Sequence, residues 1–353
     1  MAGPLDNMSE VRHSDQVRTR LGIDVKRGSM RLAAALLLVA AGLSAAACGV
    51  TRGADSRDIL MIIPNSPGGG YDQTGRAAVG VMEAQDITGG SFTVDNVIGA
   101  GGAAAMTDLV GEAGDEHTMM TVGLGVVGST YSFGSSYGLL DATPLAQLMS
   151  EPEGILVPAD SPYETVEEFV EAWKADPSSF AVGGGSSPGG PDHLFPMQLA
   201  AEVGIDPNEV NYVSYDGGGP LTSALLGGKI DAGFSGPAEF AGQVEDDELR
   251  MLAVSGEERS PQDAFADVPT LTESGIDLVF LNWRGVLAPP EISQERREEL
   301  IGYLQEMHDT DEWREVLETN GWTDDFKTGD EFATFIQEQD DRVSGTLEEL
   351  GLL

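Results

Sequence analysis

Short apolar segments alternate with helix-like segments from residue 58 onward. The apolar segments, which are typical of strands, are residues 59–63, 92–97, 118–122, 154–157, 180–182 and 210–213. The helix-like segments between them are residues 72–85, 103–111, 165–175, 193–203 and 220–226. Alternation of this kind predicts an α/β protein with largely parallel sheets.

Residues 293–353 are charged and helical by pattern. Ser293 is expected to cap the first of these helices, and Gly321 is expected to end a later one. Ser161, which precedes Pro162 and a run of acids, predicts another helix start because acidic side chains suit the positive end of a helix. We find no internal repeat.

The 353-residue chain is long enough for two domains, and 41% of its residues are hydrophobic. Its net charge is −40, from 19 Lys plus Arg against 59 Asp plus Glu. Such a surface repels nucleic acid and anionic lipid, so we expect neither as a partner. Solubility in a salty or acidic habitat is the simpler explanation of the acidity.

Residues 1–47 have the layout of a secretory signal, and residues 48–57 read as a polar tether. The segment from Leu32 to Ala47 carries no charge over 16 residues and follows basic residues. It is shorter than the ~20 residues of a comfortable membrane span. It ends at Cys48, the only cysteine, which predicts a lipoprotein signal with Cys48 as the lipidated residue. A plain cleaved signal and an uncleaved anchor are the alternatives, and Met30 is an alternative start.

Two motifs resemble catalytic or nucleotide-binding signatures only weakly. "GLGVVG" (123–128) has dinucleotide-binding spacing, but the following "STYSFGSSYG" does not read as a helix, so we expect a loop that lines a cleft. "GSSPG" (185–189) fits a nucleophile motif with Ser187, yet the following prolines and glycines forbid the required helix. A hydrolase using Ser187 is therefore a minor alternative.

No metal centre or cofactor is expected. The histidines after the signal are His117, His193 and His308, and none has another histidine or cysteine at ligand spacing. The carboxylates are too numerous for any pair to stand out.

Glycine-rich loops follow the predicted strands at residues 64–72, 99–102, 183–193 and 217–220. Ligands bind at such strand ends in open parallel sheets. Glycines expose backbone N–H groups, and helix N-termini add partial positive charge, so these loops are suited to an anion without Lys or Arg. Indeed, no Lys or Arg occurs between Arg76 and Lys174. For any single loop, turn glycines of structural use are the simpler reading.

Several motifs in order resemble the substrate-binding proteins of tripartite tricarboxylate transporters, the TctC or Bug family. They are "PNSPGGGYDQTGR", "DNVIGAGGAAA", "FAVGGGSSPGGPDHLFPMQLA", "VSYDGGGPLTSALLGGKIDAGF" and "VPTLTESG". The resemblance covers nearly all of residues 59–353.

The resemblance implies a two-lobed, Venus-flytrap (type II) periplasmic-binding-protein fold without enzymatic activity. One lobe would comprise residues 58–149 plus 289–353, and the other residues 150–288. It implies a monomeric extracytoplasmic receptor that delivers a small organic acid, such as a di- or tricarboxylate, to a membrane permease. Membrane contact would be through the lipid anchor alone. A sensor for signalling is the alternative.

The resemblance also implies that two loops, one from each lobe, hold a ligand carboxylate through backbone amides. The site residues expected from the motifs are Ser66, Pro67, Gly68, Gly69, Gly70, Tyr71, Asp72, Gly101, Ser129, Gly185, Ser186, Ser187, His193 and Asp231. Tyr71 stands where the family commonly has a small Ser or Thr. Asp72 has two candidate roles, as a cap of the following helix or as a ligand contact; we favour the cap because a bare carboxylate repels an anion.

Overall fold

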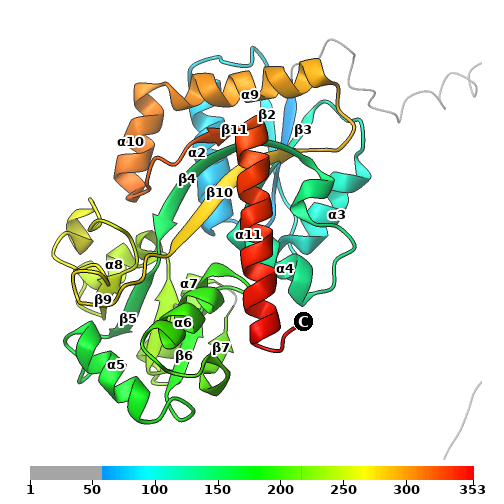
Figure 1. Ribbon diagram of the computed structural model, residues 1–353. Coiled ribbons are helices and arrows are strands. Elements are labelled where there is room, and N and C mark those ends of the chain that lie inside the picture. The colour runs from blue at the N-terminus through cyan, green and yellow to red at the C-terminus, as the bar shows by residue number, and fades with distance from the viewer. Residues whose placement is uncertain (1–57, 216) are drawn as a thin grey trace, which may run out of the picture. The chain divides into compact units, whose positions relative to one another are not determined.

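The computed structural model describes residues 58–215 and 217–353 (Figure 1), so the signal, Cys48 and the tether lie outside the described residues. Two mixed sheets organise this part of the chain. The first has the strand order β11-β4-β10-β3-β1-β2. Its strands are β1 (Ile59–Ile63), β2 (Phe92–Asn96), β3 (Thr118–Gly123), β4 (Thr143–Pro152), β10 (Leu281–Ala288) and β11 (Lys327–Thr328).

The second sheet has the order β7-β6-β8-β5-β9. Its strands are β5 (Gly154–Pro158), β6 (Ala181–Gly184), β7 (Asn211–Ser214), β8 (Ala232–Ser235) and β9 (Leu249–Val254). The chain enters this sheet after Pro152 and returns to the first sheet before Leu281. Glu153 is therefore the single residue that joins β4 of one sheet to β5 of the other.

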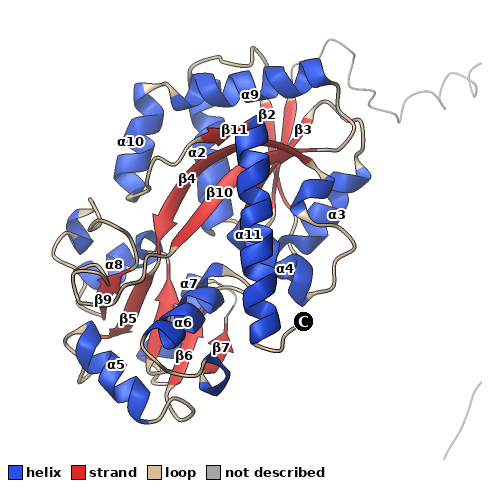
Figure 2. Ribbon diagram, in the orientation of Figure 1, coloured by secondary structure: helices blue, strands red, loops and turns tan. Residues whose placement is uncertain are grey.

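Helices flank both sheets (Figure 2). The α-helices are α2 (Gly70–Ala84), α3 (Ala103–Gly111), α4 (Leu124–Ser132), α5 (Val166–Ala175), α6 (Pro191–Glu202), α7 (Gly218–Leu226), α8 (Ala241–Glu245), α9 (Gln294–His308), α10 (Asp311–Asn320) and α11 (Gly329–Glu349). Short 3-10 helices are Ala100–Gly102, Leu139–Asp141, Pro207–Glu209, Pro237–Phe240 and Asp263–Phe265. No helix among the described residues is long and apolar enough to cross a membrane.

The alternation of side chains along β1 divides the core of the first sheet. Ile59, Met61 and Ile63 face one cluster with α2, α9 and α10, whereas Ile62 faces another with α3, α4 and α11. Successive side chains of a strand point to opposite faces, so a strand buried on both faces is apolar throughout. This is why residues 59–63 carry no polar position. In the second sheet α5 and α6 cover one face, and α7 and α8 lie in the cluster on the other.

The expectation of largely parallel sheets is wrong. β1, β2 and β3 pair in parallel, as do β6, β7 and β8, but β10 pairs antiparallel with β3 and β4. β5 also pairs antiparallel with both of its neighbours. β5 and β10 are the strands by which the chain enters the second sheet and returns to the first, and β11 adds a further antiparallel pair with β4. Apolar content does not reveal strand direction.

Sheet membership changes near the expected lobe boundary at residue 288. All of β10 (Leu281–Ala288) belongs to the first sheet. The first sheet likewise keeps β4 through Pro152. The ladder with β3 and β4 decides this membership, because the hydrogen bonds of a central strand must be satisfied by its neighbours.

The expected helix ends have mixed outcomes. Ser293 caps α9 by accepting the N–H of Arg296 at 3.2 Å, and Gly321 ends α10 with φ of 65°, as expected. The expectation for Ser161 is wrong: Thr165 caps α5 by accepting the N–H of Glu168 at 3.3 Å. Pro162 lies in a bend before this cap.

The expectation of a loop after Gly123 is also wrong, because residues 124–132 form α4. Leu124, Val126 and Val127 are fully buried against the first sheet. Burial of these side chains stabilises a helix in a segment of poor helix formers, which illustrates how tertiary packing overrides local propensity.

Candidate functional site

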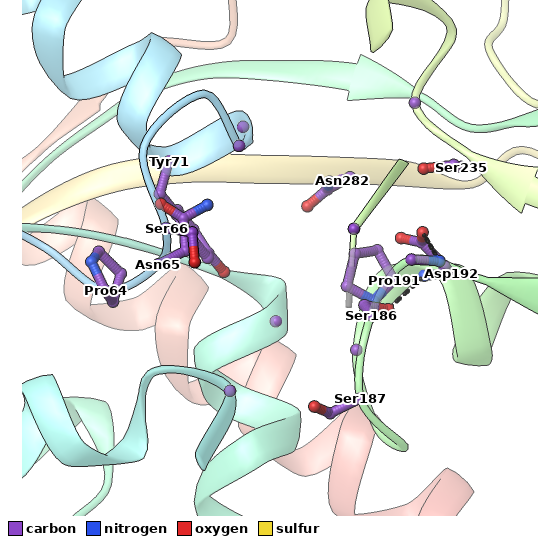
Figure 3. A pocket seen from close by; sticks show the side chains of 18 of the residues that line it. Pro64, Asn65, Ser66, Tyr71, Ser186, Ser187, Pro191, Asp192, Ser235 and Asn282 are labelled. Carbon is purple, nitrogen blue, oxygen red and sulfur yellow. Dashed lines mark hydrogen bonds between the residues drawn. The ribbon is translucent and has the colours of Figure 1, made fainter. Parts of the chain in front are cut away.

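A cavity of about 580 Å³ is lined by loops from both sheets. The first sheet contributes the loops after β1 and β2, and the second contributes the loops after β6, β7 and β8. Figure 3 shows Asn65 and Ser66 on one side of the cavity and Ser186 and Ser187 on the other. In both sheets these loops lie at the carboxyl ends of parallel strands, where α/β folds bind ligands.

The first loop is held in shape by Asp72. Gly68 has φ of 88°, which suits glycine, and its N–H donates to Asp72 Oδ2 at 2.8 Å. Asp72 Oδ1 accepts from Arg76 Nε at 2.7 Å and from Asn96 Nδ2 at 2.9 Å. These three hydrogen bonds hold the pKa of Asp72 below its usual value despite partial burial. Asp72 does not line the cavity.

Asp72 is therefore not the N-cap of α2 in the strict sense. That position belongs to Gly69, which offers no side-chain acceptor. Asp72 lies in the first turn of the helix and reaches back to the N–H that precedes the cap. The first N–H groups of α2 are left for another acceptor at the edge of the cavity.

The second loop repeats this arrangement with different residues. Gly189 has φ of 84°, and its N–H donates to His193 Nδ1 at 3.1 Å. Gly190 is the N-cap of α6 and also lacks a side-chain acceptor. Burial lowers the pKa of His193 to about 4, so its ring is neutral and Nδ1 is free to accept.

The two loops share the motif Ser-Pro-Gly-Gly, at residues 66–69 and 187–190. The cap residues Gly69 and Gly190 have nearly the same backbone angles, −77° and 170° in one and −79° and 172° in the other. In each loop the residue three positions after the cap accepts the N–H of the positive-φ glycine. This short internal repeat was missed in the sequence because Asp72 and His193 share no chemistry beyond an acceptor atom.

The structure also brings an arginine to the cavity, contrary to the expectation of a site without Lys or Arg. Arg284, on β10, is buried and lines the cavity, where it forms an ion pair with Glu151 at the end of β4. Glu151 also accepts from Asn282 Nδ2 at 3.3 Å and from Trp322 Nε1 at 3.1 Å. Arg284 and Glu151 are 133 positions apart in the sequence, so no local sequence pattern predicts their ion pair.

Tyr71, in the first turn of α2, places its hydroxyl against the first turn of α4. Its hydroxyl accepts the Val126 N–H at 3.1 Å, and its ring lies 5.9 Å from the Arg284 guanidinium carbon. Burial raises the pKa of Tyr71 to about 12. A small Ser or Thr at this position would leave that helix N-terminus open, so Tyr71 fills space that would otherwise be available to a ligand.

The loops of the two sheets touch beside the cavity. The Ser132 hydroxyl donates to the Pro188 carbonyl at 2.5 Å, and a Cβ added at Gly128 would overlap the backbone of Gly189. A Cβ at Gly101 would lie 3.2 Å from Ser187 Oγ. Glycines at these positions therefore permit α4 and the loop after β2 to approach the second loop closely.

Three further carboxylates line the cavity, from Glu153, Asp192 and Glu239. Burial raises the pKa of Asp192 to about 6 and that of Glu239 to about 7. Burial raises the pKa of Glu153 well above its usual range, and the neighbouring Asp192 and Glu151 add to the shift. These three residues carry no distinguishing sequence signal, because acids are abundant along the whole chain.

The residues expected from the sequence fall into three groups. Those that line the cavity are Ser66, Gly69, Gly70, Tyr71, Gly101, Gly185, Ser186 and Ser187. Gly68, Asp72 and His193 lie behind the cavity and hold the loops in shape. Pro67 lies within the first loop. Ser129 is buried, and its hydroxyl donates a hydrogen bond to the Val126 carbonyl at 2.9 Å. Asp231 lies outside the lining, because it precedes β8 and accepts the Ala181 N–H at the opposite strand end.

Neither hydrolysis nor metal binding gains support from the described residues. None of their hydrogen bonds joins Ser187 to a histidine, and His193 Nδ1 is engaged by Gly189. Across residues 58–215 and 217–353, no three His, Cys, Asp or Glu side chains are grouped as metal ligands.

Residues 78–352 match the sequence model of the family described as tripartite tricarboxylate transporter family receptor, TctC. A UPF0065 protein from the gbd 5' region of Cupriavidus necator is 29% identical over 299 residues, which cover 84% of this chain and 88% of that protein. The crystal structure of a TctC solute binding protein from Polaromonas is 26% identical, with a TM-score of 0.64; the match covers 84% of this chain and all of that one. MatC from Rhodopseudomonas palustris, with bound malate, shares the fold at 22% identity with a TM-score of 0.71, over 82% of this chain and 99% of MatC.

Proposed function

Because the chain belongs to the TctC family of tripartite tricarboxylate transporter receptors, we propose that it binds a small organic carboxylate between its lobes and delivers it to a membrane permease. It is a solute-binding receptor by family and has the two-lobed fold of periplasmic binding proteins. The identity of the carboxylate and the permease partner are part of the proposal. Binding of malate by MatC, a protein of the same fold, agrees with a carboxylate ligand.

The observation that carries this proposal is the pair of Ser-Pro-Gly-Gly loops at one cavity. Each loop ends in a glycine N-cap without a side-chain acceptor, so the dipoles of α2 and α6 add partial positive charge at the cavity. In α2 the first N–H groups remain available, whereas α6 begins with Pro191 and its Asp192 N–H donates to Ser186 Oγ at 3.1 Å. A ligand that contacts both loops would stabilise the closed arrangement of the lobes, because the two loops belong to different sheets. Ser66, Gly69 and Gly70 form the proposed contacts of the first loop, and Gly185, Ser186 and Ser187 form those of the second.

We also propose that the protein lies outside the cytoplasmic membrane as a lipoprotein, on the basis of the sequence before residue 58, and that it is a monomer, as the family resemblance implies. Cys48→Ser should release the mature protein from the membrane fraction. Retention of that variant in the membrane, or recovery of residues 32–47 in the mature protein, would contradict the assignment.

A thermal-shift screen of organic acids tests the function. A ligand at 100 times its dissociation constant stabilises the native state by about 2.7 kcal/mol, which such a screen detects. Gly69→Val should abolish the shift, because its side chain would meet Asn65 and obstruct the N-terminus of α2. Gly80→Ala, on α2 with open space around its Cα, is the matched control. Shifts of wild-type size in Gly69→Val would remove this loop from the site.

A further inference from the structure

The wall of the cavity has an excess of acidic side chains over basic ones. Four carboxylates line it, from Glu151, Glu153, Asp192 and Glu239, against the single guanidinium of Arg284. The ion pair with Glu151 already neutralises Arg284. Each of these carboxylates, when ionised, repels a further anion beside it. A ligand that carried only negative charge would therefore be repelled by this wall.

The remaining three carboxylates differ in how they are satisfied. Asp192 accepts the Gly185 N–H at 2.7 Å and a hydrogen bond from Ser235, and Glu239 accepts the Gly218 N–H. Glu153 is fully buried, and neither of its carboxylate oxygens has a hydrogen-bond partner among the described residues. An unpaired carboxyl group at this depth is costly to the folded state.

The position of Glu153 is fixed by its main chain. Its N–H donates to Ser255 Oγ at 2.8 Å, and its carbonyl accepts the Ser255 N–H at 2.8 Å. These bonds join the point at which the chain enters the second sheet, before β5, to the point at which it leaves that sheet, after β9. The carboxyl group is thereby held at the junction of the lobes without a protein partner.

We propose that Glu153, together with Asp192 and Glu239, forms a subsite for the protonated amine of a ligand whose carboxylate is held by the glycine loops. This inference rests on the proposed carboxylate receptor function and names the class of solute as zwitterionic. An ammonium group supplies both the hydrogen-bond donors that Glu153 lacks and the charge that the wall lacks. A metal ion is the less suitable cation, since these carboxylates are not grouped as metal ligands among the described residues.

The competing reading is that the raised pKa values leave these acids protonated as donors to a second ligand carboxylate. The groups that act on Glu153 are Asp192, Glu151, Arg284 and Glu239, and all but Arg284 favour its protonated form. Protonated acids would favour a dicarboxylate at low pH, whereas ionised acids favour an amine at high pH. Ligand charge and pH therefore separate the two readings.

The test is a thermal-shift and calorimetric screen with matched sets of ligands, carried out with the mature chain at pH 8. Each set places an ammonium, a methyl group and a carboxylate on the same carboxylic acid, as in 4-aminobutanoate, pentanoate and glutarate. The sets span short, long and aromatic acids. The amine member of the best set should bind roughly tenfold to hundredfold more tightly than its methyl counterpart, as expected for hydrogen bonds to a charged group. Its affinity should fall from pH 8 to pH 5 as Asp192 and Glu239, with pKa values of about 6 and 7, gain protons.

Glu153→Gln should remove most of the preference for the amine while the protein stays folded, because it replaces an unpaired buried carboxyl group by a neutral isostere. Glu245→Gln, on the exposed end of α8, is the control and should keep the preference. Equal or tighter binding of the methyl or dicarboxylate members would overturn the amine subsite and leave the carboxylate receptor intact. Binding of no member would overturn the proposed function and this inference with it.

Discussion

At the scale of single residues, Asp72 and His193 do the same work with different chemistry. Each supplies one acceptor atom to the N–H of a glycine with positive φ, four positions earlier. Asp72 carries a charge that Arg76 balances, whereas His193 lies buried beside the ring of Tyr212 and must be neutral. Each loop therefore needs an unprotonated acceptor at this position. The pH below which the acceptor gains a proton differs between the two loops.

His193 should stay neutral down to about pH 4, because burial lowers its pKa to about 4 from an ordinary 6.5. Between these values the unfolded chain binds a proton that the native state excludes. The contribution of His193 to the free energy of unfolding should thus fall by about 3 kcal/mol as the pH drops from 6.5 to 4. NMR titration of the imidazole measures the pKa directly.

His193→Gln keeps an acceptor and cannot titrate. As the pH falls from 6.5 to 4, the free energy of unfolding of this variant should therefore increase relative to that of the wild type. Comparing the two proteins cancels the opposite contributions of Asp192 and Glu239. An imidazole that titrates near 6.5 would contradict the arrangement.

Arg284→Met should lower the free energy of unfolding by about 3–5 kcal/mol, because it leaves Glu151 buried without its counter-charge. The double variant Arg284→Met, Glu151→Gln should recover part of this loss. Urea unfolding of the four proteins of the cycle at pH 7 measures the coupling. A double variant as unstable as the sum of the single variants would show that the two side chains act independently.

At the scale of elements, α4 connects the core of the first sheet to the second loop. Its apolar residues face the core, while Gly128 and Ser132 face Gly189 and Pro188 across the lobes. A helix at this position, in place of the expected loop, provides a rigid surface against which the second lobe rests.

Gly128→Ala should weaken ligand binding at least tenfold, or about 1.4 kcal/mol, because its methyl group would overlap the Gly189 backbone and hold the lobes apart. The helix itself should tolerate alanine well. Gly111→Ala, in α3 with open space, is the matched control and should bind normally. Calorimetry with the ligand from the screen checks both, and normal affinity in Gly128→Ala would mean that binding does not require this contact.

At the scale of the whole molecule, the chain crosses between the sheets twice, at Glu153 and between β9 and β10. Two such segments suit a hinge, and a ligand held by both loops favours the closed state through its differential contacts. Small-angle scattering of the mature protein should therefore show a smaller radius of gyration with saturating ligand. An unchanged radius would indicate a cavity whose walls do not move.

The sequence by itself determined the features that depend on neighbouring residues. The strand–helix alternation, the Ser293 cap and the glycine loops after strands follow from periodicity and turn chemistry, which act over a few positions. Both glycine-rich loops that these local signals single out line the cavity, whereas the equivalence of Asp72 and His193 in shaping them is visible only in the structure.

Only the tertiary structure decided the features that depend on distant residues. Strand direction and the membership of β10 are set by ladder partners, and α4 is helical because the first sheet buries its apolar side chains. The pairing of Glu151 with Arg284 and the isolation of Glu153 likewise arise where β4, β5 and β10 meet. The chain has 59 acidic residues, so no single carboxylate stands out in the sequence. Glu153 becomes distinctive only because the fold buries it without a hydrogen-bond partner among the described residues, and burial of that kind has no local signature.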